Sequence, residues 1–255
     1  MDILFQTAPD GELYISWLLS GLCWTLALAI FSAMLAFCMG VLVGICRSAD
    51  SLILNIIGRI YVQIFRNIPL IVQMFLAYFV LPDMLPSSLG DPIKQLGAPW
   101  GSFIPALICL SLYTGARIAE QVKAGLLSLP RGQKEASEAI GLNTVQKYML
   151  ILLPQALRII VPTLTSEAMG VFKNTSVALT IGLLELTAQA QQISEFTYET
   201  FEAFFAATVC YGVLALIIWT VMTYVERRIY VPGFSYDRPG KGAGLFSKRG
   251  NKNAA

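Results

Sequence analysis

The sequence predicts an all-α integral membrane protein with about five transmembrane helices, and three observations lead to that fold class. Of its 255 residues, 56% are hydrophobic and only 13% are charged, whereas a soluble domain has about 25% charged residues. Apolar stretches of about 20 residues, long enough to cross a bilayer core of about 30 Å, recur along the chain. Lysine and arginine gather in alternate connections between these stretches. Most of the surface is therefore expected to face lipid.

Five stretches are long enough to span the membrane. In chain order they are Ile15–Cys46, Tyr61–Leu81, Ser102–Ser128, Pro154–Leu184 and Ala203–Tyr224. The short amphipathic segment Ser51–Ile60 precedes the second stretch and suits the membrane interface. Asp83–Gly101 is rich in proline and glycine, which predicts a loop. The spans therefore divide the chain into an N-terminal segment (1–14), a transmembrane domain (15–230) and a tail (231–255), which is rich in glycine and lysine and expected to be disordered.

The distribution of positive charge orients the spans. Sixteen of the 18 lysines and arginines fall on one side, in or near the connections after the first and third spans or in the C-terminal tail. Lys94 lies on the other side, and Lys173 lies within the fourth span. Short cytoplasmic loops collect such residues. The N-terminus is therefore expected outside and the C-terminus inside, which makes the hydrophilic loop 129–153 cytoplasmic.

Several classes of function require residues or motifs that this sequence does not contain. The chain contains no histidine, which excludes Ser-His and Cys-His nucleophile pairs and histidine metal ligands. Its five cysteines lie in or beside apolar runs without a C-x-x-C pair, and no phosphate-binding G-x-x-x-x-G-K-[ST] run occurs. A net charge of +2 is too small to indicate nucleic-acid binding. We therefore expect no catalytic residue, no metal site and no cofactor bound by this chain.

Loop 129–153 carries a recognisable pattern. Gln133–Ile140 has good helix formers, and Gly141 can end that helix in a left-handed cap. The run Glu135-Ala136-Ser137, with Gly141 and then Leu153-Pro154, resembles the cytoplasmic signature of ABC-importer permeases. Ser137 replaces the usual second alanine. Two further runs resemble permeases for polar amino acids, Phe65–Gln73 (FRNIPLIVQ) and Lys173–Val177 (KNTSV).

The resemblance implies a function and a set of partners. The short helix, with Glu135, Ala136 and Gly141, would dock on a separate ATPase that uses ATP and Mg²⁺. A second permease chain, a related one forming a heterodimer, and a periplasmic amino-acid-binding protein would complete an importer in the bacterial inner membrane. The acidic outer segment around Glu185, Glu195, Glu199 and Glu202 would suit that binding protein.

The Asn67-Ile68 form of the second run is similar to the glutamate/aspartate branch of the family. This implies glutamate and aspartate as substrates, with glutamine or another polar amino acid as the alternative. An ion-coupled secondary transporter is a further alternative. The lack of two visibly related halves disfavours it.

Charges inside the spans are the candidate substrate contacts, because an unpaired charge there costs at least a few kcal/mol. Arg117 and Glu120 lie three residues apart in the third span, and Lys173 lies in the fourth. The resemblance places Arg117 where the family commonly has tyrosine, and Glu120 where an acidic residue is usual. We expect Arg117 to contact an acidic substrate group, with Lys173 second. The alternatives are an Arg117–Glu120 salt bridge and a structural role for Lys173, while Arg66 suits an interfacial anchor.

Overall fold

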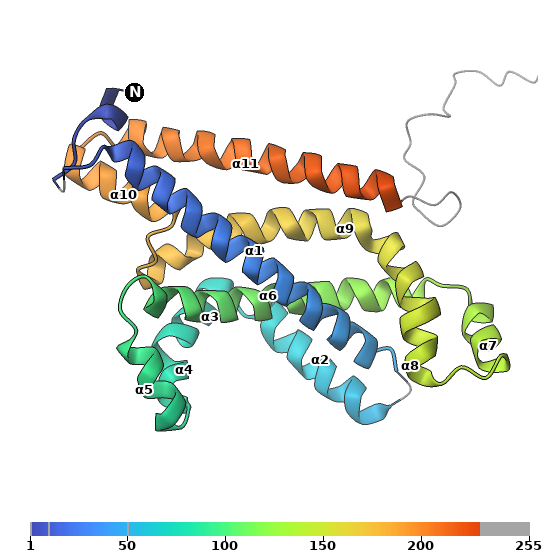
Figure 1. The fold of residues 1–255 in the computed structure, drawn as a ribbon. Coiled ribbons are helices and arrows are strands. Elements are labelled where there is room, and N and C mark those ends of the chain that lie inside the picture. The colour runs from blue at the N-terminus through green and yellow to red at the C-terminus, as the bar shows by residue number, and fades with distance from the viewer. Residues whose placement is uncertain (1, 10, 50, 230–255) are drawn as a thin grey trace, which may run out of the picture.

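The computed structural model describes residues 2–9, 11–49 and 51–229, and the regular elements in these ranges are helices (Figure 1). The disordered tail predicted for 231–255 lies outside the described residues. Within those residues, four helical stretches are long and apolar enough to cross a membrane: α1 (Tyr14–Cys46), α6 (Trp100–Leu127), the run Thr144–Ile181 and α11 (Thr200–Ile229). A bent helix pair raises the number to five. The prediction of about five spans is confirmed.

The second predicted span is a bent helix pair rather than one straight helix. α2 (Leu52–Asn67) turns by 106° into the run Leu70–Met84, which comprises α3 (Leu70–Phe75), the π-helical turn η2 (Leu76–Val80) and α4 (Leu81–Met84). Ile68 is extended because it precedes Pro69. The Gln73 side-chain amide donates to the carbonyls of Phe65 and Ile68, at 2.9 and 2.7 Å, and so satisfies backbone groups at the bend. The predicted boundary between an interfacial segment ending at Ile60 and a span beginning at Tyr61 is wrong, since α2 is continuous there.

The loop predicted for Asp83–Gly101 is also wrong, because it contains α5 (Ser87–Gln95). Pro86 stands just before this helix, where its missing N–H costs nothing. α5 packs back on α4, and an ion pair between Lys94 and Asp83 joins the two. This ion pair raises the pKa of Lys94. α4 and α5 therefore form a short helical hairpin, with Gly90 and Pro92 inside α5.

α6 lies at the centre of the bundle. In its apolar window 67% of residues are buried, against 28% in α1 and 17% in α11. α1 crosses α6 closely because it presents glycines there: a Cβ on Gly40 or Gly44 would lie 2.6 Å from Ile118 or Val122. Small residues allow helices to approach this closely. Close packing matters in a membrane because the hydrophobic effect does not drive helices together in lipid.

The two ends of the bundle differ. The N-terminus, η1 (Asp2–Phe5) and α10 (Leu186–Thr197) lie together at one end (Figure 1). α7 (Arg131–Ala139), α8 (Thr144–Gln146) and the C-terminal end of α11 lie toward the other end. The π-helical segment η3 (Lys147–Leu152) leads from α8 into α9 (Leu153–Asn174), which the 3-10 helix η4 (Thr175–Ile181) extends. The predicted topology, with the N-terminus outside and the C-terminus inside, requires η1 and the C-terminal end of α11 to lie apart in this way.

Candidate functional site

An ion pair between α6 and α9 lies within the spanning part of the bundle. The Arg117 Nε donates to Glu167 Oε2 at 2.8 Å, and its Nη2 donates to Oε1 at 3.1 Å. The Gln121 side-chain amide donates to the same Oε1 at 2.8 Å. Two parallel bonds from one guanidinium to one carboxylate are the strongest form of such a pair. The structure therefore holds Arg117 in a defined position.

Each of these two helices also carries a polar stripe. On α6 the positions that are not buried include Tyr113, Arg117 and Gln121, which share one helix face. On α9 the matching stripe comprises Thr163, Ser166, Gly170 and Lys173, none of them buried. Polar groups inside a span face a water-filled cavity or another protein element, because lipid cannot satisfy them. The stripes therefore mark the side of this chain that faces a pathway or a second subunit.

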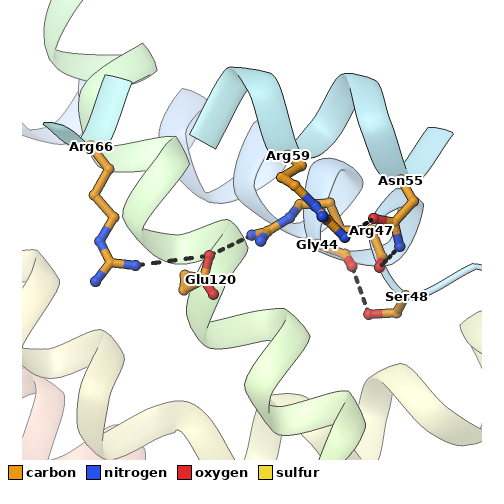
Figure 2. Close-up of polar contacts among 7 residues, drawn as sticks. All are labelled: Gly44, Arg47, Ser48, Asn55, Arg59, Arg66 and Glu120. Carbon is orange, nitrogen blue, oxygen red and sulfur yellow. Dashed lines mark hydrogen bonds and ion pairs between the residues drawn. The ribbon is translucent and has the colours of Figure 1, made fainter. Parts of the chain in front are cut away.

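The Arg117–Glu120 salt bridge offered as an alternative is wrong. Glu120 instead accepts from Arg47 Nη1 at 2.6 Å, and Arg66 Nη1 lies 3.9 Å from the same oxygen (Figure 2). Arg117 and Glu120 leave α6 toward different neighbours, Arg117 toward α9 and Glu120 toward α1 and α2. The acidic partner of Arg117 is Glu167, 50 residues further along the chain.

The Arg47 side chain is buried, with 6% of its surface exposed, at the end of α1. The Asn55 amide donates to the Arg47 carbonyl at 2.8 Å, and the Ser48 hydroxyl donates to the Gly44 carbonyl at 2.9 Å (Figure 2). These bonds hold the turn from α1 into α2. Arg66, expected as an interfacial anchor, lies on α2 with its Nη1 3.9 Å from the Glu120 carboxylate that binds Arg47.

Lys173 is exposed near the end of α9. Across residues 2–9, 11–49 and 51–229 its ammonium group has no ion-pair partner. The structure thus brings Arg117 together with Glu167 and Gln121, but not with Glu120 or Lys173. Glu167 was not among the predicted site residues. The signal that could have found it is an acidic residue inside an otherwise apolar span.

The short helix predicted within loop 129–153 is present as α7, and Gly141 follows it with a left-handed φ of +79°. The Leu142 N–H donates to the Ser137 carbonyl at 3.2 Å, which closes the cap. Ser137 is buried, whereas Glu135 and Ala136 are exposed. The helix therefore turns its small serine toward the bundle and offers Glu135 and Ala136 outward.

Two contacts fix the segment that follows α7. The buried Lys147 ammonium donates to Glu138 Oε1 at 2.6 Å. The Tyr148 hydroxyl donates to the Ser48 carbonyl at 2.6 Å. α7 is therefore joined to the α1–α2 turn as well as to α9.

Glu185 was expected to belong to an acidic outer surface that suits the binding protein. It is instead fully buried and unavailable to a partner protein. Its Oε1 accepts from the Ala188 N–H at 2.9 Å as the N-cap of α10, and its Oε2 accepts from the Tyr211 hydroxyl at 2.8 Å. Burial raises the pKa of this carboxyl group, against the lowering effect of its hydrogen bonds.

A bundle of spanning helices with an internal polar stripe, and with a small capped helix presented beyond one end, defines the membrane subunit of a transporter. Among the described residues, no three His, Cys, Asp or Glu side chains lie close enough together to hold a metal ion. The family model described as "Binding-protein-dependent transport system inner membrane component" matches residues 36–231, and the chain belongs to this family. It is a multi-pass inner-membrane permease subunit of an ABC importer and not an enzyme, and it works with an ATPase and a binding protein.

Relatives cover nearly the whole chain. The glutamate/aspartate import permease protein GltJ of Escherichia coli (strain K12) is 43% identical over 91% of this chain and 95% of its own length. The probable amino-acid ABC transporter permease protein PatM of Vibrio harveyi is 31% identical over 80% of this chain and 88% of its own. A crystal structure of an amino acid ABC transporter with histidines matches with a TM-score of 0.70 and 26% identity, over 84% of this chain and 95% of that one.

Proposed function

We propose that this permease carries the acidic amino acids glutamate and aspartate, and that Arg117 is the residue that recognises their side-chain carboxylate. The observation that carries this proposal is the place of Arg117. It is a cation within a spanning helix, on the polar stripe of α6, with 45% of its side chain exposed in this chain. The similarity to a glutamate/aspartate permease at 43% identity supports the same substrate class.

The chemistry suits a carboxylate. A guanidinium presents five donors in a planar fork and can hold a carboxylate through two parallel hydrogen bonds. A carboxylate that leaves water halfway across the membrane loses its hydration, and a fixed cation offsets that cost. The Tyr113 ring centroid lies 5.9 Å from the Arg117 guanidinium carbon, within the range of a cation–π interaction. Lys173 adds a second positive charge on the α9 stripe, and Glu120 positions the cytoplasmic half of α6 through Arg47.

Loop 129–153 is the coupling loop, through which ATP hydrolysis by the ATPase moves this chain. Glu135 and Ala136 form the outward contact with the ATPase, and Gly141 provides the sharp exit from α7. ATP and Mg²⁺ bind to the ATPase rather than to this chain. Because α7 is joined to α9 through α8 and η3, an ATPase that moves α7 moves a polar stripe as well.

The assembly contains a second permease chain. A related chain in a heterodimer would cover the α6 and α9 stripes and enclose the pathway between two subunits. The periplasmic binding protein delivers the amino acid to the end of the bundle where the N-terminal segment 1–14 and α10 lie. Glu195 and Glu199 are exposed there, and Glu202 is half-buried.

The experiment is uptake by proteoliposomes that contain this chain, its partner permease and the ATPase, with the binding protein outside. Glutamate, aspartate, glutamine and arginine are compared. Uptake of the two acidic amino acids that stops with vanadate or without the ATPase supports the proposal. Preferential glutamine uptake would favour the alternative substrate, and vanadate-resistant uptake driven by an ion gradient would overturn the ATP-driven mechanism.

Arg117 is tested in the same system. Arg117→Tyr removes the cation while keeping a large side chain, and we expect acidic amino-acid uptake to fall at least about tenfold, the equivalent of about 1.4 kcal/mol. Unchanged glutamate uptake by an intact variant complex would contradict the assignment.

A further inference from the structure

We propose that Glu167 is a specificity-determining residue: its carboxylate occupies the place on Arg117 that the substrate's side-chain carboxylate takes during transport. Substrate passage then exchanges one carboxylate for another on the same guanidinium. This inference rests on the proposed function, and it assigns a role to a residue that sequence reasoning did not select.

The first argument is chemical identity. The Glu167 side chain ends in the same group as the side chains of glutamate and aspartate, and it meets Arg117 through two bonds of 2.8 and 3.1 Å. When a substrate carboxylate reaches Arg117, the guanidinium Nε and Nη2 donors already bind Glu167. The substrate carboxylate must displace Glu167, in whole or in part, to gain the same geometry.

The second argument is burial. Only 10% of the Glu167 side chain is exposed, against 45% of the Arg117 side chain. Glu167 therefore holds the inner side of the guanidinium, and the outer side remains accessible in this chain. Without substrate, a single charge within the span would be costly, and Glu167 removes that cost. The internal pair thus stabilises the empty permease and weakens the hold on the substrate, which favours release.

The third argument is the origin of the two residues. Arg117 belongs to the central helix α6, whereas Glu167 belongs to α9, which continues the helical run from α8 and η3 next to α7. A movement of α7 that shifts α9 against α6 lengthens this ion pair. The availability of Arg117 is therefore linked to the part of the chain that meets the ATPase.

Gln121 supports the exchange. Its amide donates to Glu167 Oε1 at 2.8 Å, while its own carbonyl oxygen is buried without a hydrogen-bond partner. A buried acceptor without a donor is unfavourable. A substrate ammonium group that reaches this oxygen would satisfy it at the moment the carboxylate binds Arg117. Glutamate and aspartate each carry both groups.

The test measures binding of radiolabelled glutamate and arginine to the purified complex of both permeases and the ATPase in nanodiscs, without the binding protein. Glu167→Gln removes the competing charge and keeps the side-chain size. We expect the Kd for glutamate to fall about tenfold, and release during turnover to slow. Glu226→Gln, the same acid-to-amide change near the end of α11, serves as the matched control and should leave the Kd unchanged.

The double substitution Arg117→Glu with Glu167→Arg retains an ion pair and decides the case if Glu167→Gln fails to assemble. We expect its preference to shift from glutamate toward arginine, because the half-exposed position on α6 then carries a carboxylate. A double variant that still prefers glutamate, or binds neither amino acid, overturns the exchange.

The two proposals fail in different ways. If Arg117→Gln loses glutamate binding but Glu167→Gln leaves the Kd unchanged, the exchange is wrong and the proposed substrate contact stands. If Arg117→Gln also leaves glutamate binding unchanged, both are wrong.

Discussion

The Tyr148 hydroxyl donates a 2.6 Å hydrogen bond to the Ser48 carbonyl, across 100 residues of sequence. Ser48 follows Arg47, whose guanidinium binds Glu120 on α6 at 2.6 Å. A contiguous set of contacts therefore runs from the segment after α7 to the central helix, one turn from Arg117. Contiguity alone does not demonstrate coupling, which requires that a change at one site alter the other.

The Tyr148–Ser48 bond is expected to transmit movement of α7. Tyr148→Phe removes only the hydroxyl, so the fold should persist with a loss of about 1 kcal/mol. We expect ATPase stimulation by the loaded binding protein to fall several-fold, with basal ATP hydrolysis little changed. ATP hydrolysis with and without binding protein is the measurement. Stimulation equal to that of the unaltered complex would show that the bond is only structural.

Glu120 is expected to stabilise the packing of α1 on α6. Glu120→Gln leaves the buried Arg47 guanidinium without a charged partner. Because Glu120 is 41% exposed, the expected loss is roughly 1–3 kcal/mol, below the 3–5 kcal/mol of a fully buried pair. The measurement is thermal unfolding of the purified complex. Arg66→Gln is the control, because the Arg66 side chain is 54% exposed and 3.9 Å away, and it should change stability by less than about 1 kcal/mol.

Gly44 is expected to be intolerant of any side chain. A Cβ there would lie 2.6 Å from Val122 and 3.1 Å from the Ala119 carbonyl oxygen. Gly44→Ala should therefore separate α1 from α6 and cost about 1–3 kcal/mol. Gly212→Ala on α11, where nothing lies within 4 Å, is the control. The yield and melting temperature of the assembled complex compare the two, and equal values would show that α1 accommodates the methyl group.

Glu185 is expected to make stability depend on pH. Because burial raises the pKa of its carboxyl group in the folded protein, the neutral form is favoured there relative to the unfolded chain, whose pKa is about 4.3. This contribution is full below about pH 4.3 and is lost as pH rises through the raised pKa. Melting temperatures from pH 4 to 8 test it.

Glu185→Gln remains neutral throughout that range and can still accept from the Ala188 N–H. It should therefore gain stability relative to the unaltered protein as pH rises. A difference in melting temperature that stays constant with pH would contradict this account. Glu185→Ala, which removes the cap of α10, should be less stable than Glu185→Gln at every pH by about 1 kcal/mol.

Features that depend on local composition could be predicted from the sequence. Span length follows from apolar runs, so α1, α6 and α11 were located closely. The left-handed cap at Gly141 follows from the glycine after a short run of helix formers. The matched family model confirms the class of protein that the 135–141 pattern indicated.

Which charged side chains pair with one another depends on how the helices pack. Arg117 and Glu120, three residues apart, were the apparent pair. Side chains on a crowded central helix bind the neighbours they face, however, and the partners lie 50 residues away for Arg117 and 73 residues away for Glu120. The burial of Glu185 likewise depends on what packs beside it. Local sequence sets where a helix can form, but only packing sets which face is covered and by what.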